Sequence, residues 1–144
     1  MTRYWIGVAS SDHVEKGVQG GFAQLGHGKL APIRRLSPGD WIAYYSPRTA
    51  LKDGEPVRAF TAIGRVKAGD VYQVEQAPNF MSYRRNVAFL KSARPADIAP
   101  LLETLSFTCG KGRHWGMAFR RSVLEVSDED FARIAHAMRV KSPT

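Results

Sequence analysis

Short apolar runs, bounded by turns rich in glycine, proline and aspartate, dominate the sequence. The runs are enriched in Val, Ile, Tyr, Phe and Thr, and several of them alternate apolar with polar positions. This composition and spacing are typical of β-strands rather than long helices. We therefore predict strands over residues 4–9, 41–46, 59–66, 71–75, 87–90 and 117–126.

The clearest helical pattern lies near the C-terminus. Ser127 is a favourable N-cap, and residues 128–130 are all acidic, as the positive end of a helix dipole prefers. Four apolar residues then follow at helical spacing: Phe131, Ile134, Ala135 and Met138. We predict a helix that buries this face in the core.

Two further helices are predicted with less periodicity. Ser10 or Ser11 can cap a short helix after the first strand, and Asp12 with Glu15 has the spacing of a capping box. A second helix is predicted over residues 97–105. Strands and helices together predict an α+β fold, a mixed and strongly curved β-sheet with helices at its ends, and a single domain over residues 1–144.

Two segments fit neither pattern and are predicted to be functional loops. Residues 17–32 contain five glycines among aromatic, polar and basic groups, and residues 76–86 combine Pro78 and Asn79 with Tyr83, Arg84 and Arg85. Loops of this length in a small domain are commonly functional.

The charge is the first indication of a partner. The chain of 144 residues has 21 Lys and Arg against 13 Asp and Glu, a net charge of +8 and a pI near 10.0. A domain this basic attracts polyanions, although solubility alone is an alternative explanation. The cations are spread along the chain without a basic amphipathic helix, which disfavours a membrane surface as the partner.

Cysteine content and hydropathy indicate the compartment. Cys109 is the only cysteine, so neither an intrachain disulfide nor a cysteine-based zinc site is expected. No run approaches the roughly 18 apolar residues of a membrane span, and the N-terminus does not read as a secretory signal. We expect a cytoplasmic monomer.

The sequence resembles the EVE-domain family over nearly its whole length. The resemblance is strongest between residues 4 and 47, beginning with Trp5-Ile6-Gly7-Val8-Ala9-Ser10. The matching positions are 5–10, 13, 17, 20–24, 27–29, 39–41, 44–47, 60–64, 83–85, 115–117 and 131–134. The resemblance implies a PUA-like pseudo-barrel related to YTH domains. It also implies a nucleic-acid role, because YTH relatives hold a methylated adenine in an aromatic cage and EVE relatives are thought to read modified DNA bases.

A pocket for one nucleobase requires three kinds of side chain, and the sequence offers candidates for each. For the two flat faces of the base, the aromatic candidates are Trp5, Phe22, Tyr83 and Trp115. For the polar edge, the candidates are Ser10, Gln24, His27 and Ser46. For the phosphates, they are Lys29, Arg84 and Arg85.

Several of these candidates have a structural alternative. Trp5 is equally well explained as a core residue, Ser10 as a helix cap and His27 as a solvated loop residue. The segment 83–85 can be a basic edge strand that resists aggregation. The predicted pocket lies between the first strand–helix junction, the glycine-rich loop and residues 83–85.

Catalysis is not favoured by the motifs. The four histidines lack the spacing of a helical metal site, and the chain has neither a nucleophile elbow nor a Walker A loop. Cys109 and His114 form at most a weak candidate thiol pair. The main enzymatic alternative uses His27, Lys29 and His114 for metal-independent RNA cleavage or hydrolysis of a modified base.

The sequence therefore predicts a non-enzymatic module that binds DNA or RNA without metal or cofactor and reads one base. The resemblance implies that this base is a modified one. A protein-interaction adaptor with incidental basicity is the third alternative.

Overall fold

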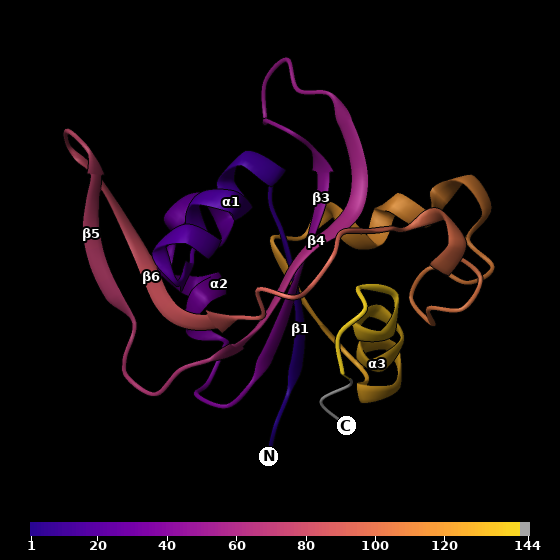
Figure 1. Ribbon diagram of the computed structural model, residues 1–144. Coiled ribbons are helices and arrows are strands. Elements are labelled where there is room, and N and C mark those ends of the chain that lie inside the picture. The colour runs from indigo at the N-terminus through magenta and orange to yellow at the C-terminus, as the bar shows by residue number, and fades with distance from the viewer. Residues whose placement is uncertain (142–144) are drawn as a thin grey trace.

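The computed structural model describes residues 1–141 as a curved mixed sheet with helices on both sides (Figure 1). The strands are β1 (Tyr4–Val8), β2 (Phe22–Ala23), β3 (Trp41–Arg48), β4 (Pro56–Val66), β5 (Tyr72–Ala77), β6 (Phe80–Phe89), β7 (Ala96–Asp97) and β8 (Val123–Val126). The helices are α1 (Ser11–Gly20), α2 (Leu30–Arg34) and α3 (Asp128–Ala137), and the 3-10 segments are η1 (Gly26–Gly28), η2 (Ala99–Leu101) and η3 (Gly112–Arg120).

The sheet follows the order β2-β6-β4-β3-β1-β8. β1 is parallel to β3 and antiparallel to β8, and the other neighbours in the order are antiparallel. β5 pairs only with the first part of β6, and the two strands form an arm that curves away from the rest of the sheet (Figure 1). The α+β class and the strongly curved sheet are confirmed.

Alternation along β1 divides the core into two clusters. Ile6 packs with α3 and its buried residues Phe131, Ile134, Ala135 and Met138. Trp5 points to the opposite face and packs with residues of α1, α2 and β3. The helix predicted from Ser127 is confirmed, since the Ser127 side chain accepts a hydrogen bond from the Asp130 amide at 3.1 Å.

The glycine-rich segment 17–32 is more ordered than predicted. α1 continues to Gly20 and ends at Gly21, which has a left-handed φ of 73° and donates its amide to the Gly17 carbonyl. β2, η1 and α2 follow directly. The glycines thus supply a helix terminus and tight turns, so the prediction of one long loop is wrong.

The segment 76–86 is a β-hairpin rather than a loop. Ala77 pairs with Phe80 across a turn in which Asn79 has a φ of 63°, a conformation that asparagine tolerates. Residues 76–81 are all exposed, so the tip of the arm has no buried face to impose an apolar alternation on its sequence. This is why the strand pattern was not visible.

Two other predicted elements are wrong. The helix over 97–105 is reduced to the 3-10 turn η2 and the turns after it, in which the amides of Leu102 and Thr104 donate to carbonyls three residues back. The strand predicted over 117–126 is formed only from Val123. Its first part belongs to η3, where Phe119 is drawn into the core by stacking on Tyr45 with ring centroids 4.0 Å apart. A tertiary contact decides the conformation here.

Candidate functional site

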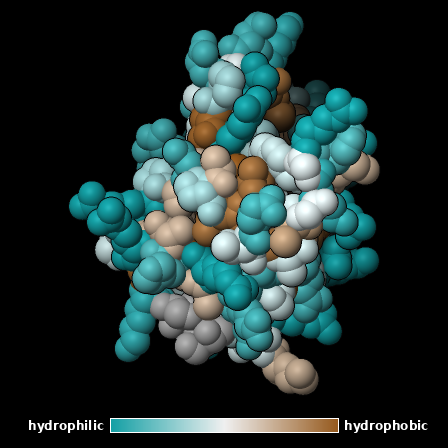
Figure 2. Space-filling model, turned by 90° about the vertical axis from the view of Figure 1, so that its right-hand side faces the viewer, coloured by the Kyte–Doolittle hydropathy of each residue, from teal (hydrophilic) through white to brown (hydrophobic). Residues whose placement is uncertain are grey.

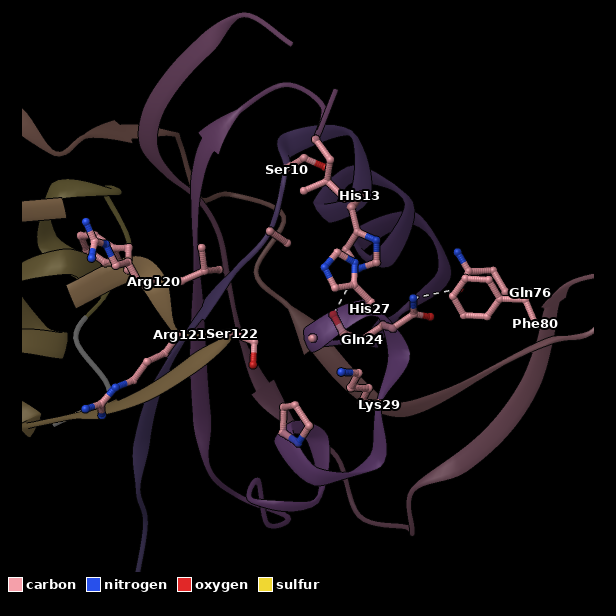
Figure 3. Close-up of a pocket in the computed structure, with 16 residues that line it drawn as sticks. Ser10, His13, Gln24, His27, Lys29, Gln76, Phe80, Arg120, Arg121 and Ser122 are labelled. Carbon is pink, nitrogen blue, oxygen red and sulfur yellow. Dashed lines mark hydrogen bonds between the residues drawn. The ribbon is translucent and has the colours of Figure 1, made fainter. Parts of the chain in front are cut away.

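A cavity of about 640 Å³ opens beside the junction of β1 and α1, and we call it the β1–α1 cavity (Figure 3). Its walls come from five places in the sequence. Residues 8–10 and 13 lie on one side, and the turn around η1 forms the floor. Leu51, the β5–β6 arm and residues 119–122 complete the rim.

The strand–helix junction supplies the first polar group. Ser10 is the N-cap residue of α1, but its side chain makes no capping hydrogen bond. It is 8 % exposed and lines the cavity. The first helical turn is instead anchored through the Asp12 amide, which donates to the Thr49 carbonyl at 3.0 Å. The Ser10 hydroxyl therefore remains available to a ligand.

His13 follows one turn later and has a defined tautomer. Its Nε2 lies 3.1 Å from the Gln24 carbonyl oxygen, which can only accept, so Nε2 carries the proton. Burial lowers the pKa of His13, and the positive charges of Arg84 and Lys16 and the ring of His27 act in the same direction. The bond to the Gln24 carbonyl opposes the shift but is the smaller effect. The ring is therefore neutral at pH 7, and Nδ1 is a hydrogen-bond acceptor.

Gln24 connects the cavity floor to the β5–β6 arm. Its Nε2 donates to Gln76 Oε1 at 3.0 Å, as the dashed line in Figure 3 marks, and its Oε1 accepts from Arg84 Nε at 2.9 Å. Ser82 Oγ also donates to Gln76 Oε1, at 2.6 Å. The Gln24 backbone is held as well, because Tyr44 Oη donates to its carbonyl at 3.2 Å. Burial raises the pKa of Tyr44, which keeps this phenol protonated.

The floor of the cavity is a left-handed turn. Gly26, His27 and Gly28 have φ values of 56°, 60° and 82°. Glycine suits this region, but His27 does not, and a non-glycine residue held there marks strain of the kind found at functional sites. A Cβ at Gly28 would lie 2.5 Å from Ser82 Oγ, so the turn packs tightly on β6. His27 is exposed and turned to the cavity beside His13 (Figure 3).

The charge of the cavity is entirely positive. Lys29 borders it on one side, and Arg120 and Arg121 stand at the opposite edge with their guanidinium groups directed away from the histidines (Figure 3). No aspartate or glutamate belongs to the lining, all of which falls within residues 1–141. Such a surround attracts an anionic ligand.

Four of the sequence-predicted site residues meet at the cavity: Ser10, Gln24, His27 and Lys29. The predicted meeting of the first strand–helix junction with the glycine-rich segment is therefore seen. Residues 83–85 do not take part, and Gln76 and Phe80 from the same hairpin line the cavity in their place. Gln24 differs from its prediction, since both atoms of its amide are already bonded within the protein.

The aromatic candidates do not converge. Trp5 is 1 % exposed, and its Nε1 donates to Asp40 Oδ2 at 2.9 Å, so it is a core residue. Phe22 is covered by the Arg84 guanidinium at 3.9 Å, and Tyr83 packs against the Trp5 side of the core. Trp115 lies in a separate groove. The predicted cage of these rings is corrected to a cavity whose aromatic walls are Phe80 and Phe119.

Three polar candidates are also occupied elsewhere. Ser46 is fully buried and shares a 2.7 Å hydrogen bond with Thr61. Arg85 is 8 % exposed and donates to the Gly69 carbonyl at 2.7 Å, so it cannot reach a phosphate in this conformation. Arg84 is half-buried between Phe22 and Gln24. Both arginines organise the protein itself.

Sequence reasoning missed most of the cavity lining, including His13, Gln76, Phe80, Phe119, Arg120 and Arg121. His13 was visible as a position matching the family, one turn after Ser10 on the same helix. The others lie on the β5–β6 hairpin and at η3, for which the sequence predicts a loop over 76–86 and a strand over 117–126.

Residues 1–141 contain no group of three or more His, Cys, Asp or Glu placed to hold a metal ion. Within the same residues, no helix is long and apolar enough to cross a membrane.

The fold and the cavity define a small EVE- and YTH-like domain. The chain belongs to the EVE-domain family, whose model matches residues 3–137. It is 48% identical to UPF0310 protein YdcG of Bacillus subtilis over 141 residues, covering 96% of this chain and 94% of that protein. It is 52% identical to a UPF0310 protein of Mycolicibacterium vanbaalenii over 134 residues, covering 93% and 91%.

Solved structures support the fold. The MmI1 YTH domain superposes with a TM-score of 0.60 at 10% identity, covering 96% of both chains. Protein PSPTO5229 of Pseudomonas syringae gives a TM-score of 0.56 at 16% identity, covering 92% of this chain and 97% of that one. At these identities the likeness concerns the fold alone.

Proposed function

We propose that the protein binds nucleic acid and that the β1–α1 cavity receives one nucleobase, preferably a modified one, turned out of its strand. The observation that carries this proposal is the charge of the site. The cavity is roomy, partly apolar and bordered by Lys29, Arg120 and Arg121 without an acidic side chain. A base enters such a space while its phosphates contact the cations outside.

The walls fit the two parts of a base. Phe80 and Phe119 offer flat apolar surface, and Ser10 and His13 offer polar groups for an edge. A methyl or hydroxymethyl substituent adds area for the apolar wall to cover, worth about 25 cal/mol per Å². The family membership and the YTH-like fold support a nucleic-acid partner. We further propose that the protein acts in the cytoplasm, since its exposed Cys109 is suited to a reducing compartment, and that it acts as a monomer.

The direct test is fluorescence anisotropy with labelled single strands that differ at one position. The strands carry cytosine, 5-methylcytosine, 5-hydroxymethylcytosine, adenine or N6-methyladenine, as DNA and as RNA, at two salt concentrations. We expect the strand with one of the modified bases to bind most tightly at both salt concentrations. Binding that is equal for all strands and disappears with salt would limit the function to nonspecific electrostatic contact.

A matched pair of variants locates the contact. Lys29→Gln removes a cation from the cavity rim, whereas Lys67→Gln removes one from an exposed turn elsewhere. Each phosphate contact on a single strand contributes about 0.7 to the slope of log K against log salt. Lys29→Gln should lower the slope by about this amount, and Lys67→Gln should leave it unchanged.

One observation favours a second candidate function. His114 lies away from the cavity, so the predicted trio of His27, Lys29 and His114 is not assembled. His13, however, joins His27 and Lys29, and two histidines beside a cation are a possible acid–base pair for metal-independent RNA cleavage. Incubation with labelled RNA distinguishes the functions: a reader yields no product, whereas a nuclease yields fragments that His13→Ala abolishes.

A further inference from the structure

A second hollow lies on the surface of η3, and we call it the Trp115 groove. It has a volume of about 290 Å³ and is lined by Phe107, Lys111, His114, Trp115, Met117 and Ala118. Figure 2 faces the side of the molecule on which residues 90–120 lie, and shows apolar surface recessed among hydrophilic side chains. The lining of the groove is mostly apolar, with Lys111 and His114 as its polar members.

The groove and the β1–α1 cavity share one wall. η3 directs Phe119 into the cavity and Trp115 into the groove, and the centroids of these two rings are 6.2 Å apart. Tyr45 lies against both, with its ring centroid 4.0 Å from Phe119 and 6.4 Å from Trp115. The Trp115 ring is thus held by the core, although part of it stays accessible.

The two rings are close together but not parallel. Their centroids are 6.2 Å apart and their planes are inclined by 73°, so bases packed on them would lie at an angle to each other, as neighbours do when one base is turned out of a strand. A base in the cavity therefore leaves its neighbour close to Trp115.

The charge of this surface is also one-sided. Residues 104–124 include Lys111, Arg113, Arg120 and Arg121 and contain no aspartate or glutamate. All four cations are exposed. Arg120 and Arg121, at the end of η3, line the cavity, and in Figure 3 their side chains point away from the histidines. A phosphodiester that leaves the cavity on the side of η3 would pass them.

We infer that the Trp115 groove is a second subsite of the same strand, in which a base flanking the one in the cavity stacks on Trp115. The inference rests on the proposed function and adds a second contact to it. The occupant is a nucleotide of single-stranded DNA or RNA. Its flat nucleobase matches the Trp115 ring, and its anionic phosphate matches the cations of η3 and its neighbours. Stacking of this kind tolerates any base, so the groove contributes affinity without adding sequence preference.

The test compares a short with a long ligand. The short ligand is a nucleoside 5′-monophosphate carrying the preferred base, and the long one is a labelled eight-nucleotide strand with the same base at its centre. Loss of one stacked base costs about 5- to 150-fold in affinity. We expect Trp115→Ala to weaken the eight-nucleotide strand by this factor and to leave the monophosphate unaffected, while Trp115→Phe restores most of the affinity.

Trp41→Phe is the matched control, because Trp41 packs against Phe131 and Arg65 away from the groove. Thermal melts verify that each variant is folded, and Trp115→Phe keeps the test informative if the alanine variant does not fold. Intrinsic fluorescence gives a second readout: the long strand should quench emission in wild type and in Trp41→Phe, but not in Trp115→Phe.

The outcomes separate the two proposals. An eight-nucleotide strand that binds Trp115→Ala and wild type equally overturns the second subsite and leaves the proposed function intact. Equal losses for the monophosphate and the strand also overturn it, since Trp115 would then act through the cavity. If no strand binds wild-type protein, the proposed function fails and the second subsite fails with it.

Discussion

Replacing His13 by alanine tests whether the cavity reads a base edge through one fixed acceptor. In the wild type, the Gln24 carbonyl orients the ring and holds the proton on Nε2, which leaves Nδ1 to accept from a ligand. A donor on the base that loses its acceptor inside the cavity costs about 1–3 kcal/mol, which corresponds to about 5- to 150-fold in affinity. We expect His13→Ala to weaken strand binding within this range.

The free energy of unfolding of the variant should change by no more than the lower end of this range. The Gln24 carbonyl keeps the hydrogen bond from Tyr44 when His13 is removed, so only one part-buried bond is lost. Such a bond contributes about 1 kcal/mol. Urea unfolding measures this change, and His136→Ala, which removes an exposed histidine from the end of α3, is the matched control.

The pH dependence has a defined sign. Because burial lowers the pKa of His13, the unfolded chain binds a proton there more readily than the folded protein once the pH falls below the ordinary value of about 6.5. Wild-type stability should therefore decrease with falling pH through this window, and His13→Ala should lack that part of the decrease. Binding should weaken at lower pH, as the pH falls through the lowered His13 pKa of the folded protein, since a protonated ring has no acceptor.

Two results would refute this reasoning. One is an affinity of His13→Ala equal to that of His136→Ala at pH 7. The other is an identical pH dependence of stability in His13→Ala and wild type between pH 5 and pH 7, which would show that His13 is not held in its neutral form.

Three other substitutions test the framework around the cavity. Asp40 is 1 % exposed and accepts hydrogen bonds from the amides of Arg3 and Ser37 and from Trp5 Nε1, so Asp40→Ala should cost about 3–5 kcal/mol in urea unfolding. A loss below 1 kcal/mol would contradict that role. His27→Gly relieves a left-handed residue and should raise stability by about 1 kcal/mol while weakening strand binding; a loss of stability would argue against strain. Ser127→Ala removes the cap of α3 and should lower the free energy of unfolding by about 0.5–2 kcal/mol, whereas Ser127→Asp should keep most of the wild-type stability.

The fold could be predicted where side chains on one face are buried. The alternation of β1 and the helical spacing after Ser127 correspond to real core faces, and both elements were predicted within a residue or two. The strand predicted over 71–75 corresponds to β5, but the first part of β6 was missed because the exposed tip of the arm imposes no pattern. η3 was taken for a strand because Phe119 reaches the core by stacking on Tyr45, a contact between residues distant in the sequence.

The site was predictable only in part, for a related reason. Residue type and resemblance indicated the strand–helix junction and the segment 24–29, which do line the cavity. The same criteria favoured Trp5, whose indole is used to bind Asp40, and Gln24, whose amide is used to hold the arm. Whether a polar or aromatic group is free for a ligand depends on partners that local sequence does not reveal.

The most direct test of the cavity as a base-binding site is an NMR titration of ¹⁵N-labelled protein with a short strand carrying the preferred base. The account predicts that the largest saturable shifts fall on amides at the cavity, including Ser10, Gly26 and His27, with smaller shifts along η3. Shifts confined to exposed basic residues elsewhere, such as Lys67 and Lys91, would contradict it.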